Sequence, residues 1–203
     1  MGRIAIKSLG IFLVFGMFFS CGAKKNTAKT GLKLIEGTQF YYTVSYGDYE
    51  YDFYINLNSF DREDGFSFDW YLDNNRGSVF MKAEALKSAM ALHNYFNVAT
   101  ITLSDKTSVW ISEKMFQAIK TGKPVEIDLG KEKQTFTLKR KDIYTFKHKV
   151  FGEKIQVPIL VISTSDNEKE IWIIDNIENS LIVKMNLEFK IKLNSYKQYD
   201  DFK

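Results

Sequence analysis

Alternation of apolar and polar residues with a period of two constrains this chain more than any other feature of its sequence. In FYYTVSY, the side chains of Phe40, Tyr42 and Val44 share one face of an extended chain, and the stretches YEYDFYINL and FSFDWYL alternate in the same way. Neighbouring side chains of a strand point to opposite faces, so this pattern is typical of antiparallel strands with one buried and one solvated face. Turn-forming residues at 47–48 and 61–65 separate these strands.

More strands are expected along the rest of the chain. A fourth strand should cover residues 78–81. The later candidates are residues 125–129, 134–139, 143–148, 155–163, 170–175, 181–186 and 189–196. The sequence therefore predicts about ten strands.

Two helices are expected between the fourth strand and the later ones. Residues 82–97 carry apolar side chains such as Ala85 and Leu92 at helical spacing. Residues 113–121 follow Ser112, which is a good N-cap, and place their apolar side chains on one face.

These elements predict a mainly β (α+β) fold. A long antiparallel sheet twists and curls, and its apolar face must be covered. We expect a strongly curved antiparallel meander sheet or incomplete barrel, with the two helices inserted after strand four and packed on the concave face. Residues 32–203 should form one domain, because no long linker interrupts them.

The first residues have a different character. Arg3 and Lys7 are basic, residues 9–19 are almost wholly apolar, and the run ends at FFSC with Cys21, the only cysteine of the chain. The run is too short to span a bilayer as a helix, which takes roughly 20 residues. A basic start, a short apolar run and small residues at its end are typical of a secretory signal peptide.

The FFSC sequence resembles the lipobox of a bacterial lipoprotein precursor, with Ser20 and Cys21 at its two most demanding positions. The resemblance implies a signal peptide at 1–20, cleavage before Cys21 and lipidation of that cysteine, for example with palmitate. Residues 21–31 would then be the lipidated cysteine and a flexible tether. Gly22 follows the cysteine where an Asp favours inner-membrane retention, so the expected location is the cell envelope, anchored to the outer membrane and facing the periplasm. A free or intermolecularly bonded thiol and an uncleaved membrane anchor are the alternatives for this region.

The hydropathy pattern of the body is similar to that of curled-sheet periplasmic proteins, which include the lipoprotein carriers and the outer-membrane lipoprotein receptor of the Lol system. It also resembles uncharacterised periplasmic domain families that end in a Trp-bearing strand hairpin, here EIWIIDNIENSLIVKM. The first resemblance implies a carrier of apolar molecules, by analogy of fold alone.

Charge is nearly balanced but unevenly distributed. Lys and Arg number 28 against 25 Asp and Glu, which argues against a nucleic-acid partner. Acids dominate residues 48–73 and bases dominate residues 131–154. The two stretches are either solvated sheet faces or a surface for a polar partner, such as anionic lipid headgroups or an acidic protein.

The sequence gives little indication of catalysis. Two histidines, His93 and His148, occur without a GxSxG motif, and no set of residues has the spacing of a zinc site. The acidic residues 61–65 lack EF-hand spacing, which favours a hairpin loop over calcium binding. Paired carboxylates for glycoside chemistry stay open, because such residues can be distant in sequence. We expect no cofactor, no metal and no enzymatic activity, with a hydrolase as the alternative.

Aromatic side chains dominate the predicted apolar face, either as packed core or as the lining of a pocket for an apolar ligand such as a lipid. The candidate lining residues are Tyr42, Tyr51, Phe53, Phe66, Phe68, Trp70, Trp110 and Met115. The alternative is a scaffold lipoprotein that binds another envelope protein through a sheet edge or its charged faces. Both hypotheses place the acylated Cys21 in the lipid bilayer.

Overall fold

The computed structural model describes residues 32–96 and 98–198, and these residues form one eleven-stranded sheet with two short α-helices. The predicted signal peptide, Cys21 and the tether lie outside the described residues. The elements in chain order are β1 (Gln39–Tyr46), β2 (Tyr49–Asp61), β3 (Gly65–Leu72), β4 (Asn75–Met81), α1 (Ala83–Ser88), β5 (Thr100–Leu103), α2 (Glu113–Lys120), β6 (Val125–Asp128), β7 (Lys133–His148), β8 (Lys154–Ser163), β9 (Glu170–Ile174), the 3-10 turn η1 (Ile177–Asn179), β10 (Ile182–Asn186) and β11 (Lys190–Lys197).

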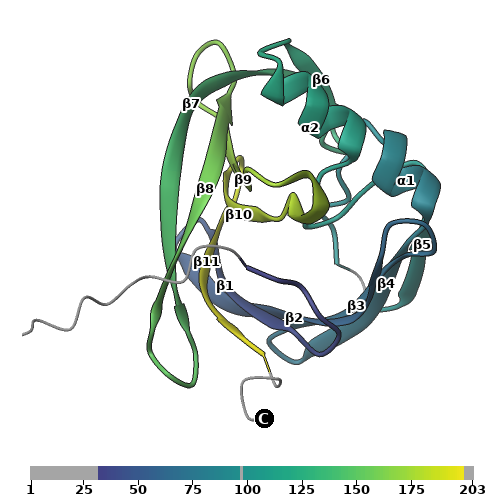
Figure 1. Cartoon of the computed structure of the whole chain (residues 1–203), viewed down its shortest axis with the longest axis vertical. Coiled ribbons are helices and arrows are strands. Elements are labelled where there is room, and N and C mark those ends of the chain that lie inside the picture. Colours follow the sequence, from purple (N-terminus) through teal and green to yellow (C-terminus); the bar gives the residue numbers. More distant parts are fainter. Residues whose placement is uncertain (1–31, 97, 199–203) are drawn as a thin grey trace, which may run out of the picture.

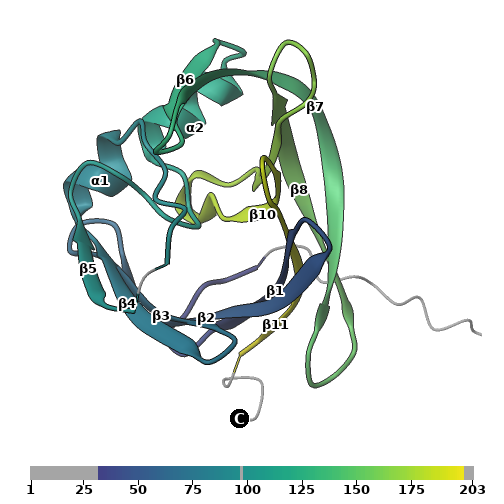
Figure 2. The same cartoon turned by 180° about the vertical axis from the view of Figure 1, so that it is seen from behind.

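The strands lie in the order β5-β4-β3-β2-β1-β11-β10-β9-β8-β7-β6, so the first and last strands of the chain pair with each other in the middle of the sheet. Most pairs are antiparallel, whereas β4–β5 and a short contact between β11 and β7 are parallel. The sheet curls into a ring that stays open between β5 and β6, and α1 and α2 lie at this opening (Figures 1 and 2). The predicted mainly β fold, with a strongly curved sheet and two helices after the fourth strand, is confirmed.

The first helix is shorter than predicted. It ends at Ser88, and residues 89–96 continue as extended chain instead of completing a helix to residue 97. The backbone here pairs with other segments: Leu92 N donates to Asp128 O at 2.8 Å, and His93 N donates to Thr107 O at 2.7 Å. These tertiary hydrogen bonds replace the intrahelical ones, which overrides the helical spacing of the apolar residues.

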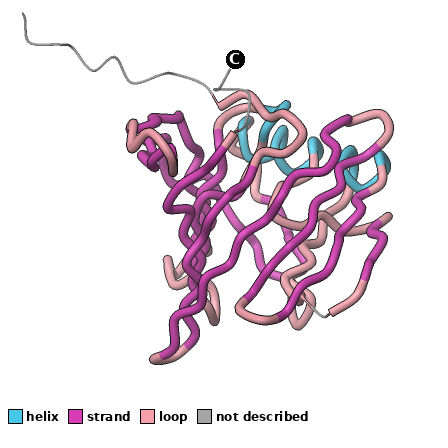
Figure 3. The backbone as a smooth tube through the Cα atoms, turned by 90° about the horizontal axis from the view of Figure 1, so that it is seen from below, coloured by secondary structure: helices cyan, strands magenta, loops and turns pink. Residues whose placement is uncertain are grey.

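The second helix follows its sequence signals. The Ser112 side chain accepts a hydrogen bond from Met115 N at 3.1 Å, as an N-cap does. Gly122 takes a positive φ of 74° after the helix, where glycine is the least strained residue. Figure 3 shows both helices gathered on one side of the strands.

Strand β7 replaces two predicted strands, 134–139 and 143–148, with one strand of 16 residues. Its pairing with β8 shifts between Leu138 and Arg140, which is a β-bulge. The extra residue changes which side chains face inward, so Leu138 faces the helices whereas Tyr144 faces the opposite core. The polar residues around the bulge resemble a turn in sequence, which explains the wrong prediction.

Two apolar cores result. The first lies within the curl of β1–β4 and includes Trp70, Trp110 and Tyr144, while the second packs α2 against β6–β10. Strand β8 belongs to both, with Val161 in the first core and Leu160 in the second. Burial on both faces explains why β8 reads as a continuous apolar run in sequence.

Glycine is required at position 77, where β4 pairs with Trp70 of β3. A Cβ atom there would lie 2.4 Å from the carbonyl oxygen of Ala99 and 2.8 Å from the Trp70 indole. We predict that Gly77→Ala lowers the free energy of unfolding by about 2 kcal/mol, because neither the backbone nor the buried indole has room to move. Urea denaturation measures this change.

The matched control is Gly47→Asn in the β1–β2 turn. Gly47 has a φ of 57°, and a Cβ atom added there would meet no other atom within 4 Å. Asn tolerates this backbone conformation, so the free energy of unfolding should change by less than about 0.5 kcal/mol. An equally small effect of Gly77→Ala would contradict the close approach of Ala99.

Candidate ligand-binding cavity

A cavity of about 410 Å³ lies beside the inward face of β1 and β2. Its lining is mainly apolar and comes from parts of the chain that are distant in sequence. The apolar and aromatic lining residues are Tyr42, Val44, Tyr46, Phe53, Leu72, Tyr95, Phe96, Val109, Ile182, Met185, Phe189 and Ile191. Such a volume lies within the range of about 300–1,000 Å³ that is usual for small-molecule sites.

One wall of the cavity is the alternating face that the sequence predicts. Tyr42 on β1 and Phe53 on β2 are directly paired across the two strands, with ring centroids 5.9 Å apart. An adjoining part of the lining comes from the extended segment after α1, where the Phe96 ring packs against that of Phe53 with ring centroids 4.9 Å apart. Because α1 ends at Ser88, the residues after it are extended and can line the cavity.

The cavity opens to solvent at the end of β1 that carries Tyr46. Tyr46 and Tyr95 both line the cavity, and they are 61% and 48% exposed. Amphipathic aromatic residues suit a position between an apolar interior and water.

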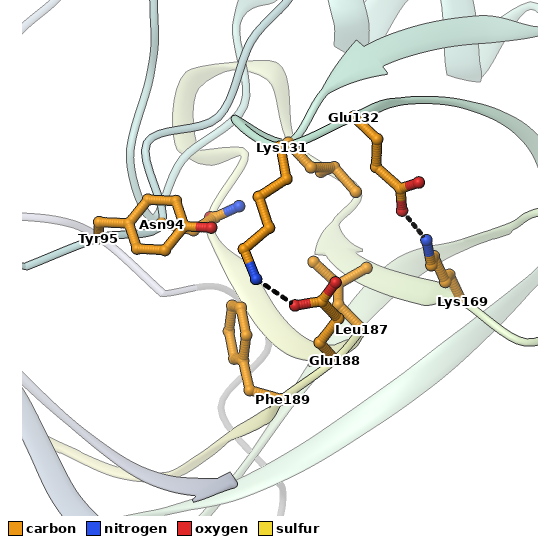
Figure 4. Close-up of a pocket in the computed structure, with 9 residues that line it drawn as sticks. Asn94, Tyr95, Lys131, Glu132, Lys169, Leu187, Glu188 and Phe189 are labelled. Atoms are coloured by element: carbon orange, nitrogen blue, oxygen red, sulfur yellow. Dashed lines mark hydrogen bonds and ion pairs between the residues drawn. The ribbon is translucent and has the colours of Figure 1, made fainter.

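An ion pair spans this mouth. Lys131 in the β6–β7 turn reaches Glu188 in the β10–β11 turn, with 2.8 Å between Nζ and Oε2 (Figure 4). Both residues line the cavity and also a smaller neighbouring hollow, where Glu132 pairs with Lys169. The hydrogen bond to Glu188 raises the pKa of Lys131. Both partners are well exposed, so the pair is weak enough to open.

Polar atoms inside the cavity are few. The Tyr42 hydroxyl donates to Ile182 O at 3.1 Å, and the Ser108 hydroxyl donates to the backbone carbonyl of His93 at 3.0 Å. His93 also lines the cavity, and its Nε2 atom is buried without a hydrogen-bond partner among the described residues. Burial lowers the pKa of His93, which keeps the ring neutral at pH 7.

The predicted lining residues divide into three groups. Tyr42 and Phe53 line the cavity, and Tyr51 lies half-buried farther along β2, stacked on Tyr49. The remaining predicted residues are fully buried and lie outside the cavity lining: Phe66, Phe68, Trp70, Trp110 and Met115.

These buried residues do not all meet. The Trp110 ring lies 5.8 Å from both Phe66 and Phe68 in the first core, whereas Met115 on α2 belongs to the second core. Trp110 and Met115 were predicted as lining residues, and neither lines the cavity. The mouth is formed by Tyr46 at the end of β1, by Tyr95, and by the turn residues Lys131 and Glu188, and alternation gives no signal for the turn residues.

The described residues contain no group of three or more acidic, cysteine or histidine side chains arranged to hold a metal ion. The acidic loop at 61–65 is a turn, in which the Asp61 carboxylate accepts hydrogen bonds from the backbone N–H groups of Glu63 and Asp64. The Nδ1 atom of His148 accepts from the N–H groups of Val150 and Phe151 and so holds the β7–β8 turn.

Comparison of the sequence and the structure with family models, curated proteins and solved structures gives no match. In residues 32–96 and 98–198, neither helix has the length and apolar character needed to cross a bilayer.

Two buried tyrosines, Tyr42 on β1 and Tyr144 on β7, donate hydrogen bonds to backbone carbonyls of other strands. The Tyr144 hydroxyl donates to Leu193 O at 2.7 Å, and burial raises the pKa of Tyr144 to about 12. Burial also raises the pKa of Tyr42 well above its usual value. Both side chains therefore stay neutral in the folded protein at a pH where exposed tyrosines ionise.

We predict that the stability advantage of the wild type over Tyr144→Phe shrinks at high pH. At pH 7 the lost hydrogen bond should lower the free energy of unfolding by about 1 kcal/mol. Because the pKa of Tyr144 is raised in the folded state, its contribution is complete below about pH 10 and is lost as the pH rises toward 12. Urea denaturation of both proteins between pH 8 and pH 11 measures the difference.

Tyr49→Phe is the matched control, because Tyr49 is 68% exposed. Its difference from the wild type should stay close to zero over the same pH range. A constant difference for Tyr144→Phe would contradict a raised pKa at this position.

Proposed function

We propose that this protein is a lipid-anchored protein of the cell envelope whose folded domain binds an apolar ligand, such as an acyl chain, in the cavity beside β1 and β2. The observation that carries the proposal is the cavity itself, with its apolar lining and its exposed aromatic mouth. Apolar pockets with a few placed polar groups are the usual form of small-molecule sites. The domain acts by binding and carries out no chemistry on the ligand.

The proposed location rests on the leader. The apolar run ends at Cys21, and acylation of that cysteine would hold the domain at the outer membrane on its periplasmic side.

The ligand is proposed to carry one small polar group, such as a hydroxyl. Among the buried side-chain nitrogen and oxygen atoms of the described cavity lining, only the Nε2 atom of His93 lacks a hydrogen bond. A hydroxyl can donate and accept, so it would satisfy either tautomer of the neutral imidazole. Leaving a buried polar atom unsatisfied is unfavourable, and a polar ligand group removes that cost.

Filling the cavity should abolish binding. Val44 is half-buried on β1 and lines the cavity, so Val44→Trp places an indole in the ligand space. We predict at least tenfold weaker binding of the apolar dye N-phenyl-1-naphthylamine, measured by fluorescence on a chain that begins at Gly22. Both apolar cores lie between Leu32 and Tyr196, so this chain keeps every core residue.

Thr43→Trp is the matched control, because Thr43 is the neighbouring residue on β1 and points to the opposite face of the strand. Its dye affinity should equal that of the wild type. The wild-type chain should also yield an apolar molecule on extraction with chloroform and methanol. Failure of the wild type to bind the dye, together with an extract that holds no ligand, would contradict the binding function and favour the scaffold role.

His93 should make the cavity bind ligands that carry a polar group more tightly than ligands that lack one. We predict that 1-naphthol displaces the dye from the wild type about tenfold better than 1-methylnaphthalene, because only the hydroxyl can bond to Nε2. His93→Leu should remove this preference while both compounds still displace the dye. Equal displacement by both compounds from the wild type would contradict the role of His93 and leave apolar binding intact.

A further inference from the structure

A second surface feature lies away from the cavity, between the far end of the β7–β8 hairpin and β11. A hollow of about 380 Å³ is lined there by Lys147, Lys154 and Lys192 together with hydroxyl, amide and two apolar residues, and its lining contains no carboxylate. Three ammonium groups around one hollow form a site of positive potential.

The positions of the lysines in the sheet create charge repulsion in the isolated protein. Lys147 lies directly opposite Lys154. Lys184 lies directly opposite Lys192 in the β10–β11 pair, and its ammonium group also lies 4.2 Å from the centroid of the Trp172 ring. Like charges at directly paired positions destabilise a sheet. None of these four lysines forms an ion pair with another described residue. An anionic partner would relieve this repulsion.

The tip of the same hairpin exposes two apolar side chains, Val150 and Phe151, between the exposed Lys149 and Glu153. Val150 and Phe151 are each 48% exposed, in a hairpin that extends beyond the ring (Figures 1 and 2). His148 fixes their backbone through its Nδ1 atom, and its ring stacks on Phe151 with centroids 4.7 Å apart. The tip therefore presents apolar side chains in an ordered turn.

The hairpin lies at the end of the domain where the described chain begins. Lys149 N donates to Tyr196 O at 2.7 Å. Two residues farther along, the Gln198 side chain donates to the carbonyl of Lys33. A lipid attached before residue 32 would therefore hold this end of the domain closest to the bilayer.

We propose that the lysine hollow and the hairpin tip dock on a membrane surface, with the lysines on the phosphates of anionic lipid headgroups and Val150 and Phe151 in the interfacial layer. Basic residues beside exposed apolar side chains match a bilayer surface, which is anionic outside and apolar beneath. The proposal goes beyond ligand binding and stands without it, because the two sites share no residue.

Sedimentation with lipid vesicles tests the proposal on the chain that begins at Gly22, which lacks the acylated cysteine. The wild type should bind vesicles of phosphatidylcholine and phosphatidylglycerol at 7:3 at least tenfold better than vesicles of phosphatidylcholine alone. Combined Lys147→Gln, Lys154→Gln and Lys192→Gln should weaken binding by roughly a hundredfold, at about fivefold per lysine. Val150→Asn should weaken it severalfold by removing the apolar contact.

The matched control combines Lys87→Gln, Lys114→Gln and Lys123→Gln. These exposed lysines lie on or next to the two helices, and the control removes the same total charge. Binding within threefold of the wild type supports a localised site. Equal losses in the two triple variants, or no preference of the wild type for anionic vesicles, would overturn the proposal.

A competition experiment separates a lipid headgroup from free phosphate. Replacing chloride by inorganic phosphate at constant ionic strength should leave vesicle binding unchanged within twofold. Complete displacement by a few millimolar phosphate would overturn the assignment to lipid. Circular dichroism and thermal unfolding verify that each variant is folded.

Discussion

The pairing of the first strand with the last is the interaction on which the rest of the structure depends. Strands β1 and β11 align from Gln39 opposite Lys197 to Ser45 opposite Lys190, with one register shift at Tyr41. This ladder joins β2–β5, which lie on one side of β1 and β11 in the strand order, to β6–β10, which lie on the other side. Contacts between residues so far apart in sequence form only after a large loss of chain entropy, so the ladder must be supported by extensive burial. Tyr42 provides part of that support by a hydrogen bond from β1 to Ile182 O on β10, and Tyr144 on β7 adds a hydrogen bond to Leu193 O on β11.

The cavity follows from this closure. The ladder places the inward face of β1 next to β10 and β11, so Val44 and Ile191 are paired and both line the cavity. The ring cannot close at its other end, because β5 and β6 are four-residue strands with the helices between them. The chain after α1 must therefore cross the opening in extended form, and Phe96 completes the cavity wall. If residues 82–97 formed one uninterrupted helix, this part of the cavity wall would be missing.

The features that could be predicted from the sequence are those that short-range residue patterns determine. The inward faces of β1–β3 and the cap of α2 at Ser112 are local properties, and they agree with the structure. The end of α1 and the bulge near Lys139 depend on hydrogen bonds to distant segments, so no local pattern could predict them. The same limit applies to the cavity: Tyr42 and Phe53 come from predicted strands, but His93, Lys131 and Glu188 reach the cavity from segments that only the tertiary fold brings together.

The two proposed sites lie toward opposite ends of β1. The cavity mouth is at Tyr46, whereas the hairpin contacts the end of β11 that pairs with Gln39. The eight residues of β1 separate these ends by about 24 Å, at about 3.4 Å per residue. A domain docked through the hairpin would therefore turn its cavity mouth away from the bilayer. Its ligand would then arrive from the aqueous side or from a second protein, rather than by direct extraction from the membrane below. For the proposed ligand-binding function, this geometry favours a receiving or holding role, in which a ligand would enter the cavity past the Lys131–Glu188 pair.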